Sequence, residues 1–132
     1  MPDAPSGPCP CSSGEAYPAC CGRWHAGEPA PTAEALMRSR YTAFVLRDAS
    51  YLLTTWDPAT RPDDLELDDD VRWLRLLVLG TTGGGPFDDE GTVAFEAHHR
   101  RGGERAVLRE DSEFRRARDP RHGRVWRYVG PR

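Results

Sequence analysis

Four cysteines, all between positions 9 and 21 of a 132-residue chain, are the feature that most constrains what this sequence can form. Two are separated by one residue and two are adjacent, in the order Cys9, Cys11, Cys20 and Cys21. A disulfide or redox pair fits poorly, because adjacent cysteines bridge each other only with strain. A structural metal site fits better, because four thiolates about 2.3 Å from one zinc ion complete its tetrahedral shell. Zinc is the expected ion, and iron also accepts four thiolates.

His25 follows the cysteine cluster closely. Four cysteines already fill a tetrahedral shell, so we expect this histidine to lie at the surface or to pack against the protein. A shell with no open position also predicts a structural rather than a catalytic metal. Such a metal would stabilise a segment that is too short to fold alone.

The pattern C-P-C-x-S-G-x-x-Y-x-x-C-C-G, read from PCPCSSGEAYPACCG, resembles the SEC-C motif. This small zinc-binding element is found at the C-terminus of the translocase motor SecA and in other bacterial proteins. Ser12 stands where the motif usually has Gly, and Glu15 and Ala16 stand where it often has Lys. The resemblance implies that Tyr17 packs inside the knuckle and that the metal ligands are Cys9, Cys11, Cys20 and Cys21.

The composition is that of a soluble globular protein, with 38% hydrophobic and 30% charged residues. No apolar run approaches the roughly 18 residues of a membrane span, and MPDAPSGPCPC lacks the features of a signal peptide. We therefore expect a cytoplasmic protein. The net charge of -3 hides an acidic stretch at 57–70 and an Arg-rich stretch at 100–132, each expected to be a solvated face.

Two helices are predicted between residues 32 and 56. Thr32 can cap a helix that runs to about Arg47, and Asp48 can cap a short one that ends before Pro58. At 100° per residue, Arg40 falls near the centre of the apolar stripe of the first helix, which is formed by Leu36, Met37, Tyr41 and Phe44. A guanidinium there must pair with an acid or line a polar cavity.

Four strands follow, predicted at residues 71–80, 92–100, 105–117 and 125–130. Their connections are of hairpin length, which predicts an antiparallel sheet, and TTGGGPFDD is read as a turn rather than a phosphate loop. Glu110 interrupts a largely apolar face of the third strand and is the expected partner of Arg40, with the face formed by Ala106, Leu108, Glu110, Ser112 and Phe114. Helices followed by strands predict an α+β architecture with two helices on one face of a curved sheet.

The segments TAEALMRSRYTAF, TTWDPATRP, WLRLLVLGTTGG, FDDEGTVAF, LREDSEF and WRYVG resemble the YchJ-like family of bacterial proteins. That family joins an N-terminal SEC-C motif to a domain resembling nuclear transport factor 2, a cystatin-like α+β roll. The resemblance covers about residues 8 to 130, with Arg109 where relatives often have His. It implies a zinc knuckle and linker at 1–27 and a roll domain at 28–132, and it implies no particular activity.

Rolls of this type hold a pocket between helices and sheet. The candidate pocket residues are Arg40, Tyr41, Trp56, Glu110, Ser112 and Trp126, with Glu96 and His98 or His99 on the neighbouring strand. We expect a metal-stapled, non-enzymatic binding module that recognises a protein or a small molecule. One alternative is an RNA- or ribosome-associated protein that uses the Arg and aromatic residues of 115–128. The other is an enzyme that uses Glu110 beside Arg40.

Overall fold

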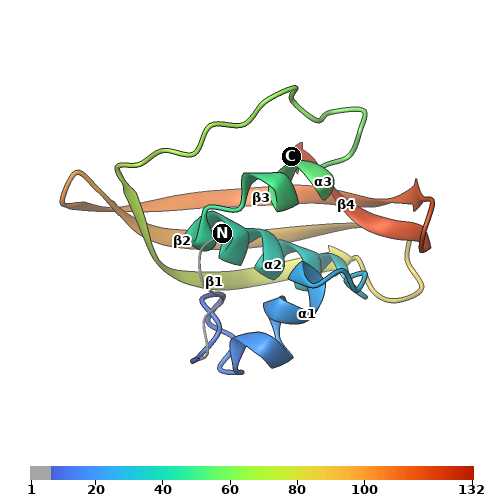
Figure 1. Cartoon of the computed structure of the whole chain (residues 1–132), viewed down its shortest axis with the longest axis horizontal. Coiled ribbons are helices and arrows are strands. Elements are labelled where there is room, and N and C mark those ends of the chain that lie inside the picture. The colour runs from blue at the N-terminus through green and yellow to red at the C-terminus, as the bar shows by residue number, and fades with distance from the viewer. Residues whose placement is uncertain (1–6) are drawn as a thin grey trace.

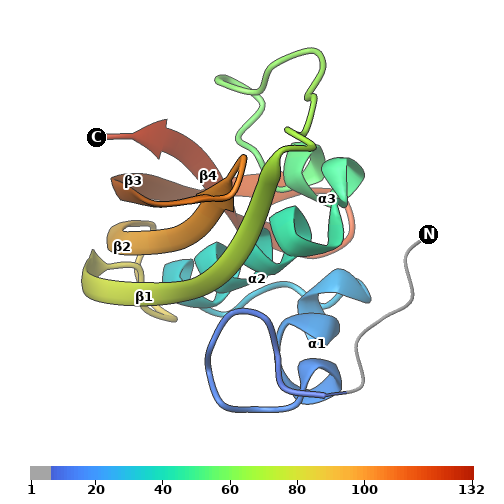
Figure 2. The same cartoon turned by 90° about the vertical axis from the view of Figure 1, so that its left-hand side faces the viewer.

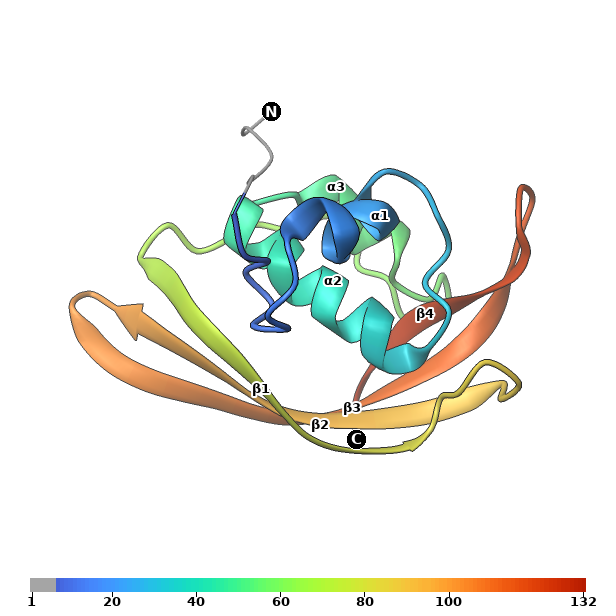
Figure 3. The same ribbon diagram turned by 90° about the horizontal axis from the view of Figure 1, so that it is seen from below.

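A four-stranded antiparallel sheet in the order β1-β2-β3-β4 forms the framework of the structure (Figure 1). The computed structural model describes residues 7–132. The strands are β1 (Val71–Gly83), β2 (Glu90–Arg101), β3 (Glu104–Asp119) and β4 (Gly123–Pro131). The sheet curves into a trough, and the helices lie on its concave side (Figure 3). The predicted α+β fold with a curved antiparallel sheet is confirmed.

The helix α2 (Ala33–Leu46) occupies the trough on the concave side of the sheet (Figure 3). It begins where the Thr32 hydroxyl accepts a hydrogen bond from the Ala35 N–H at 3.0 Å, and it ends at Arg47, whose backbone is left-handed. Its apolar face packs on the sheet. Its opposite face is also buried and carries the small residues Ser39, Thr42 and Ala43. α2 is therefore covered on both sides.

Three short helices complete the helical layer: the 3-10 helix Tyr17–Ala19, α1 (Cys21–His25) and α3 (Ala49–Thr54). The Asp48 carboxylate accepts a hydrogen bond from the Tyr51 N–H at 3.0 Å and caps α3, as predicted. We call residues 7–25 the knuckle. Figure 2 shows it packed against α2. The first six residues of the predicted segment 1–27 lie outside the described residues.

The glycine-rich turn between β1 and β2 lets both strands run longer than predicted. Gly83 and Gly84 have positive φ angles of 56° and 73°. A Cβ on Gly91 would lie 2.5 Å from the backbone of Gly84, so only glycine fits where the two strands approach. The predicted turn is confirmed, with residues 84–89 connecting the strands.

The acidic segment 57–70 passes from α3 back to the start of β1 (Figure 1). At its start the Asp57 N–H donates to the Tyr128 carbonyl at 2.7 Å, which covers the free edge of β4. At its end Asp69 accepts a hydrogen bond from Arg47 at 2.5 Å, and Asp68 accepts one from Arg101. No helix within residues 7–132 combines the length and the apolar character needed to cross a membrane.

Candidate metal centre and cavity

The four cysteines converge on one point. The Sγ atoms of Cys9, Cys11, Cys20 and Cys21 all lie within 4.8 Å of one another, and those of Cys11 and Cys20 are 3.6 Å apart. A tetrahedron of sulfurs around zinc has edges of about 3.8 Å, given bonds of about 2.3 Å. All four are free thiols, three of them buried and Cys20 partly exposed. The predicted four-cysteine cluster is present and fits a tetrahedral metal ion.

A tight loop brings the cysteines together. The Cys9 N–H donates to the Glu15 carbonyl at 2.8 Å, and Ser12 and Gly14 both have positive φ angles. Tyr17 is buried, as the motif implies. A Cβ on Gly22 would lie 2.7 Å from the Tyr17 carbonyl oxygen, so this position requires glycine.

The electrostatics of the cluster favour a bound cation. Hydrogen bonds from Cys11 and then Cys21 lower the pKa of Cys9 to about 3. Hydrogen bonds to Cys11 and Cys9, together with burial, raise the pKa of Cys21. The first thiolate therefore forms readily, while further ionisation is opposed by the charge already present. A divalent cation removes that opposition, and metal binding releases the remaining protons.

The face of α2 opposite the sheet supplies polar contacts to the knuckle. The Thr42 hydroxyl donates to Cys21 Sγ at 3.3 Å and lies 3.7 Å from Cys9 Sγ. Arg38 donates to the Cys11 carbonyl at 3.0 Å. Hydrogen bonds of this kind orient metal ligands, and sequence reasoning did not find Thr42. The sequence feature that could have pointed to Thr42 is a second set of small residues on α2, which indicates a second buried face of the helix.

Ser12 docks the knuckle on the sheet. Its hydroxyl accepts a hydrogen bond from the Leu76 N–H of β1 at 3.2 Å. Its φ of 68° is in the left-handed region, where glycine is favoured. The serine that replaces the usual glycine of the motif therefore makes a contact that glycine cannot make.

His25 is a packing residue. Its Nε2 lies 2.8 Å from the Ser39 carbonyl and its Nδ1 lies 2.7 Å from the Tyr17 hydroxyl. A carbonyl can only accept, so Nε2 carries the proton and Nδ1 accepts from Tyr17. Burial lowers the pKa of His25, which keeps the ring neutral. His25 thereby joins the knuckle to α2.

A cavity of about 190 Å³ lies between α2 and the concave face of the sheet. Five of the six predicted pocket residues line it: Arg40, Tyr41, Trp56, Glu110 and Ser112. Trp126 does not, because it lies further along β4, where its Nε1 donates to the Pro31 carbonyl at 3.3 Å. Sequence reasoning missed the lining residues Phe44, Trp73, Phe95 and Tyr128. Tyr128 shares a strand face with Trp126, so the argument that proposed Trp126 could also have proposed Tyr128. For Trp73, a bulge directly after it in β1 disturbs the alternation of faces along the strand.

The expected direct pair between Arg40 and Glu110 is not formed. Nη1 of Arg40 donates to the Leu52 carbonyl and to the Thr55 hydroxyl, both at 2.7 Å. The Glu110 carboxylate instead accepts hydrogen bonds from the Ser112 hydroxyl and, at 3.0 Å, from the Tyr128 hydroxyl. The guanidinium is bound by the Leu52 carbonyl of α3 and by Thr55, the residue directly after α3. Tyr128 contacts both Arg40 and Glu110.

Aromatic faces complete the environment of Arg40. Its guanidinium carbon lies 4.4 Å from the centre of the Tyr128 ring and 5.1 Å from that of Trp56. Burial lowers the pKa of Arg40 to about 10, so it remains charged at neutral pH.

The neighbouring strand contributes none of its predicted polar residues to this cavity. Glu96 pairs with Arg109 and with His98, at 3.2 Å from the latter. His99 is buried, with its ring 5.1 Å from that of Trp73.

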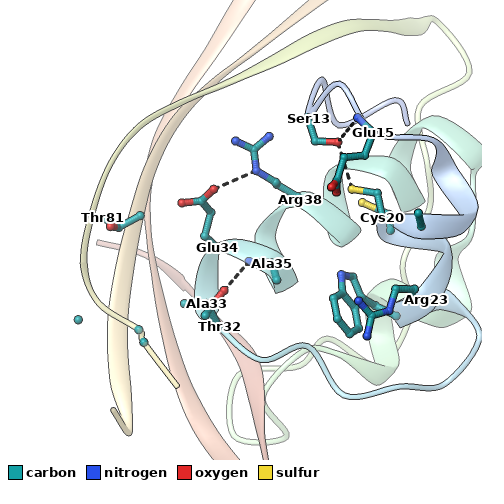
Figure 4. A pocket seen from close by; sticks show the side chains of 16 residues that line it. Ser13, Glu15, Cys20, Arg23, Thr32, Ala33, Glu34, Ala35, Arg38 and Thr81 are labelled. Atoms are coloured by element: carbon teal, nitrogen blue, oxygen red, sulfur yellow. Dashed lines mark hydrogen bonds and ion pairs between the residues drawn. The ribbon is translucent and has the colours of Figure 1, made fainter. Parts of the chain in front are cut away.

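A second hollow, an open groove of about 480 Å³, separates the knuckle from the start of α2 (Figure 4). Cys20 reaches solvent here, and its Sγ lies 3.2 Å from the Ser13 hydroxyl. The groove's two arginines are both paired, Arg38 with Glu34 and Arg23 with Glu28, each at 3.0 Å. The groove therefore exposes one edge of the cysteine cluster, and both of the arginines that line it are paired with carboxylates.

A profile of the middle, NTF2-like domain of YchJ matches residues 32–131. The chain belongs to the YchJ-like family. A UPF0225 protein of Corynebacterium efficiens is 58% identical over 109 residues, which cover 82% of this chain and 83% of the relative. A UPF0225 protein of Streptomyces coelicolor is 55% identical over 113 residues, which cover 85% of this chain and 88% of the relative. The suspected family is thus confirmed.

Two solved structures of SEC-C motif proteins resemble this YchJ-like chain closely. The solution structure of a SEC-C motif-containing protein from Rhodopseudomonas palustris has a TM-score of 0.79 and 37% identity, over 95% of this chain and 97% of that one. The crystal structure of a SEC-C motif-containing protein from Psychrobacter arcticus has a TM-score of 0.78 and 27% identity, over 94% of this chain and 81% of that one. The pairing of a SEC-C knuckle with an NTF2-like roll is therefore a shared architecture.

Proposed function

We propose that this chain is a non-enzymatic binding module of the bacterial cytoplasm, in which a structural zinc ion fastens the knuckle to α2 and the roll cavity receives a small molecule. The observation that carries the proposal is the cavity itself. Aromatic side chains form its walls, and the buried cation Arg40 lies among them. Largely apolar cavities with a few convergent polar groups are the usual form of small-molecule sites.

The metal has a structural role in this proposal. Cys9, Cys11, Cys20 and Cys21 would hold zinc and leave no position for a substrate. Zinc would supply the positive charge that lets four neighbouring sulfurs ionise. Reduced thiols agree with a cytoplasmic location.

The geometry gives less support to the two alternatives. Several arginines of β3 and β4 are engaged with carboxylates, among them Arg115 with Asp57 at 2.6 Å, Arg124 with Asp89 at 3.1 Å and Arg127 with Asp119 at 3.6 Å. This pairing reduces the charge they present to a phosphate backbone. For catalysis, Glu110 has two hydroxyl donors on one oxygen and does not form the expected dyad with Arg40.

The test uses the four tryptophans of the chain as internal probes. Trp56 and Trp73 line the cavity, while Trp24 and Trp126 lie elsewhere. A library of small fragments is screened against the zinc-loaded, ¹⁵N-labelled protein, and the indole N–H signals are followed by NMR. The proposal predicts fragments that move the signals of Trp56 and Trp73 and leave the other two in place. A library in which no fragment moves the two cavity signals would contradict it.

A further inference from the structure

Trp56, one of the residues that line the cavity, carries a buried donor that the described part of the protein does not satisfy. Among residues 7–132, the Trp56 indole nitrogen is the one buried side-chain nitrogen or oxygen without a hydrogen-bond partner. Leaving a buried N–H unpaired costs about 1–3 kcal/mol. Such orphans are uncommon in folded proteins, so this one indicates an acceptor that a ligand supplies.

Arg40 adds further donors at the same place. Arg40 is only 5% exposed. Its side chain forms two hydrogen bonds with the described part of the chain, and Nη1 donates both. Nε and Nη2 are thus available, and the guanidinium lies over the Trp56 ring at 5.1 Å. Two adjacent side chains that line the cavity, Arg40 and Trp56, therefore carry N–H groups without an acceptor in the described part of the chain.

The positive charge of Arg40 also lacks a directly bonded carboxylate in the described part of the chain. None of the ion pairs within residues 7–132 includes Arg40. A carbonyl, a hydroxyl and aromatic faces contact its guanidinium, and the Glu110 charge acts on it without a direct hydrogen bond. A carboxylate matches both needs of the guanidinium, because it carries the opposite charge and two acceptor oxygens.

The residues that line the cavity and the cavity volume indicate which other chemical group a ligand has. The cavity is bounded by Tyr41, Phe44, Trp73, Phe95, Phe114 and Tyr128. Flat rings pack against such walls in stacked or edge-to-face geometry. An apolar cavity of about 150 Å³ holds benzene, so one of about 190 Å³ accommodates a benzene ring with a small substituent.

Glu110 marks one end of the cavity and sets the ligand's orientation. It is half-buried, and its neighbour on the same strand face, Leu108, is 42% exposed, so this end opens to solvent. A ligand carboxylate is repelled by Glu110 and attracted by Arg40, and so points inward. We infer that the roll cavity binds a small aromatic carboxylate, with its carboxylate on Arg40 and Trp56 and its ring between the aromatic walls. This inference rests on the proposed function, because it names the class of molecule that the cavity receives.

Four probes of the same shape test the inference: benzoate, benzamide, benzylamine and toluene. Each is titrated into the zinc-loaded protein while the indole signals of Trp56 and Trp73 are followed by NMR. Benzoate is expected to bind with a dissociation constant of about 0.1–1 mM, which is ordinary for nine heavy atoms. It should bind at least tenfold more tightly than benzamide, which keeps the acceptor and loses the charge, and benzylamine should bind least. Benzamide, toluene or benzylamine binding as tightly as benzoate would overturn the carboxylate while leaving the cavity a binding site. If neither these probes nor the fragment library moves the two signals, the proposed function itself fails.

The variant Trp56→Phe tests the contribution of the unpaired indole N–H to binding. It removes the N–H and keeps an aromatic wall, so benzoate affinity, followed at Trp73, should fall by about tenfold or more. The melting temperature should fall only slightly, because removal of an unpaired buried donor offsets part of the packing that the smaller ring loses. Trp24→Phe is the matched control outside the cavity and should change neither quantity. Unchanged benzoate affinity in Trp56→Phe would contradict the role of the indole.

Glu110→Gln provides an independent variant that keeps the hydrogen bonds of Arg40 to Leu52 and Thr55. It removes the negative charge at the mouth, so benzoate affinity should rise a few-fold while toluene affinity stays constant. A fall in benzoate affinity would show that Glu110 attracts the ligand, and would overturn the inferred orientation.

Discussion

Thr42→Val should weaken metal binding without unfolding the protein. Valine has nearly the shape of threonine, and Thr42 is fully buried between the knuckle and the body of the roll. The change removes the hydroxyl that donates to Cys21 Sγ at 3.3 Å. Loss of such an outer hydrogen bond typically lowers metal affinity 10- to 100-fold, which corresponds to about 1.4–2.7 kcal/mol. This range agrees with the roughly 1.5–3 kcal/mol of one hydrogen bond to a charged group.

Competition with a chromophoric zinc chelator measures this effect. The parent, Thr42→Val and Thr42→Ser are compared at the same pH, and circular dichroism checks that each is folded. Thr42→Ser keeps the hydroxyl and should retain most of the affinity. If Thr42→Val and the parent withstand the chelator equally, the hydroxyl does not support the metal ligands and the described coupling between α2 and the knuckle is refuted.

Substitutions at three further residues test how the knuckle, α2 and the sheet pack together. Arg40→Met should lower the free energy of unfolding by about 3 kcal/mol in urea denaturation, because two hydrogen bonds of a charged group are lost, and an unchanged midpoint would contradict its burial. Burial lowers the pKa of His25, so the stability that its neutral ring contributes is present above the unfolded pKa of about 6.5 and lost as the pH falls below it. The parent should therefore lose more stability than His25→Gln between pH 8 and 5.5, and equal losses would argue against a neutral His25. Ser12→Ala should destabilise by about 1 kcal/mol through loss of the hydrogen bond from Leu76 N–H, whereas Ser12→Gly should lie closer to the parent in thermal denaturation, because glycine relieves the positive φ.

The features that could be predicted from the sequence depend on residues close together in the chain. The cysteine spacing identified the cluster because all four cysteines lie in one short segment, between positions 9 and 21. Thr32 and Asp48 marked the starts of α2 and α3, because a cap bonds to a backbone N–H only three residues away. The hairpin connections likewise determined the antiparallel order of the strands.

The features that were missed depend on how distant elements meet. The burial of Arg40 followed from the helical period, but its partners lie on α3 and directly after it, and no local pattern reveals the position of α3. Trp126 and Tyr128 share a strand face, and only the placement of α2 along the trough decides which of them borders the cavity. Thr42 became a candidate only when the knuckle was seen on the far side of α2.

Metal analysis of the untagged protein, purified without added metal, tests the central claim most directly. Elemental analysis is combined with a thiol titration before and after chelation. The account predicts about one zinc per chain and four thiols that become reactive only when the metal is removed. A folded protein without metal, whose four cysteines react at once, would contradict it.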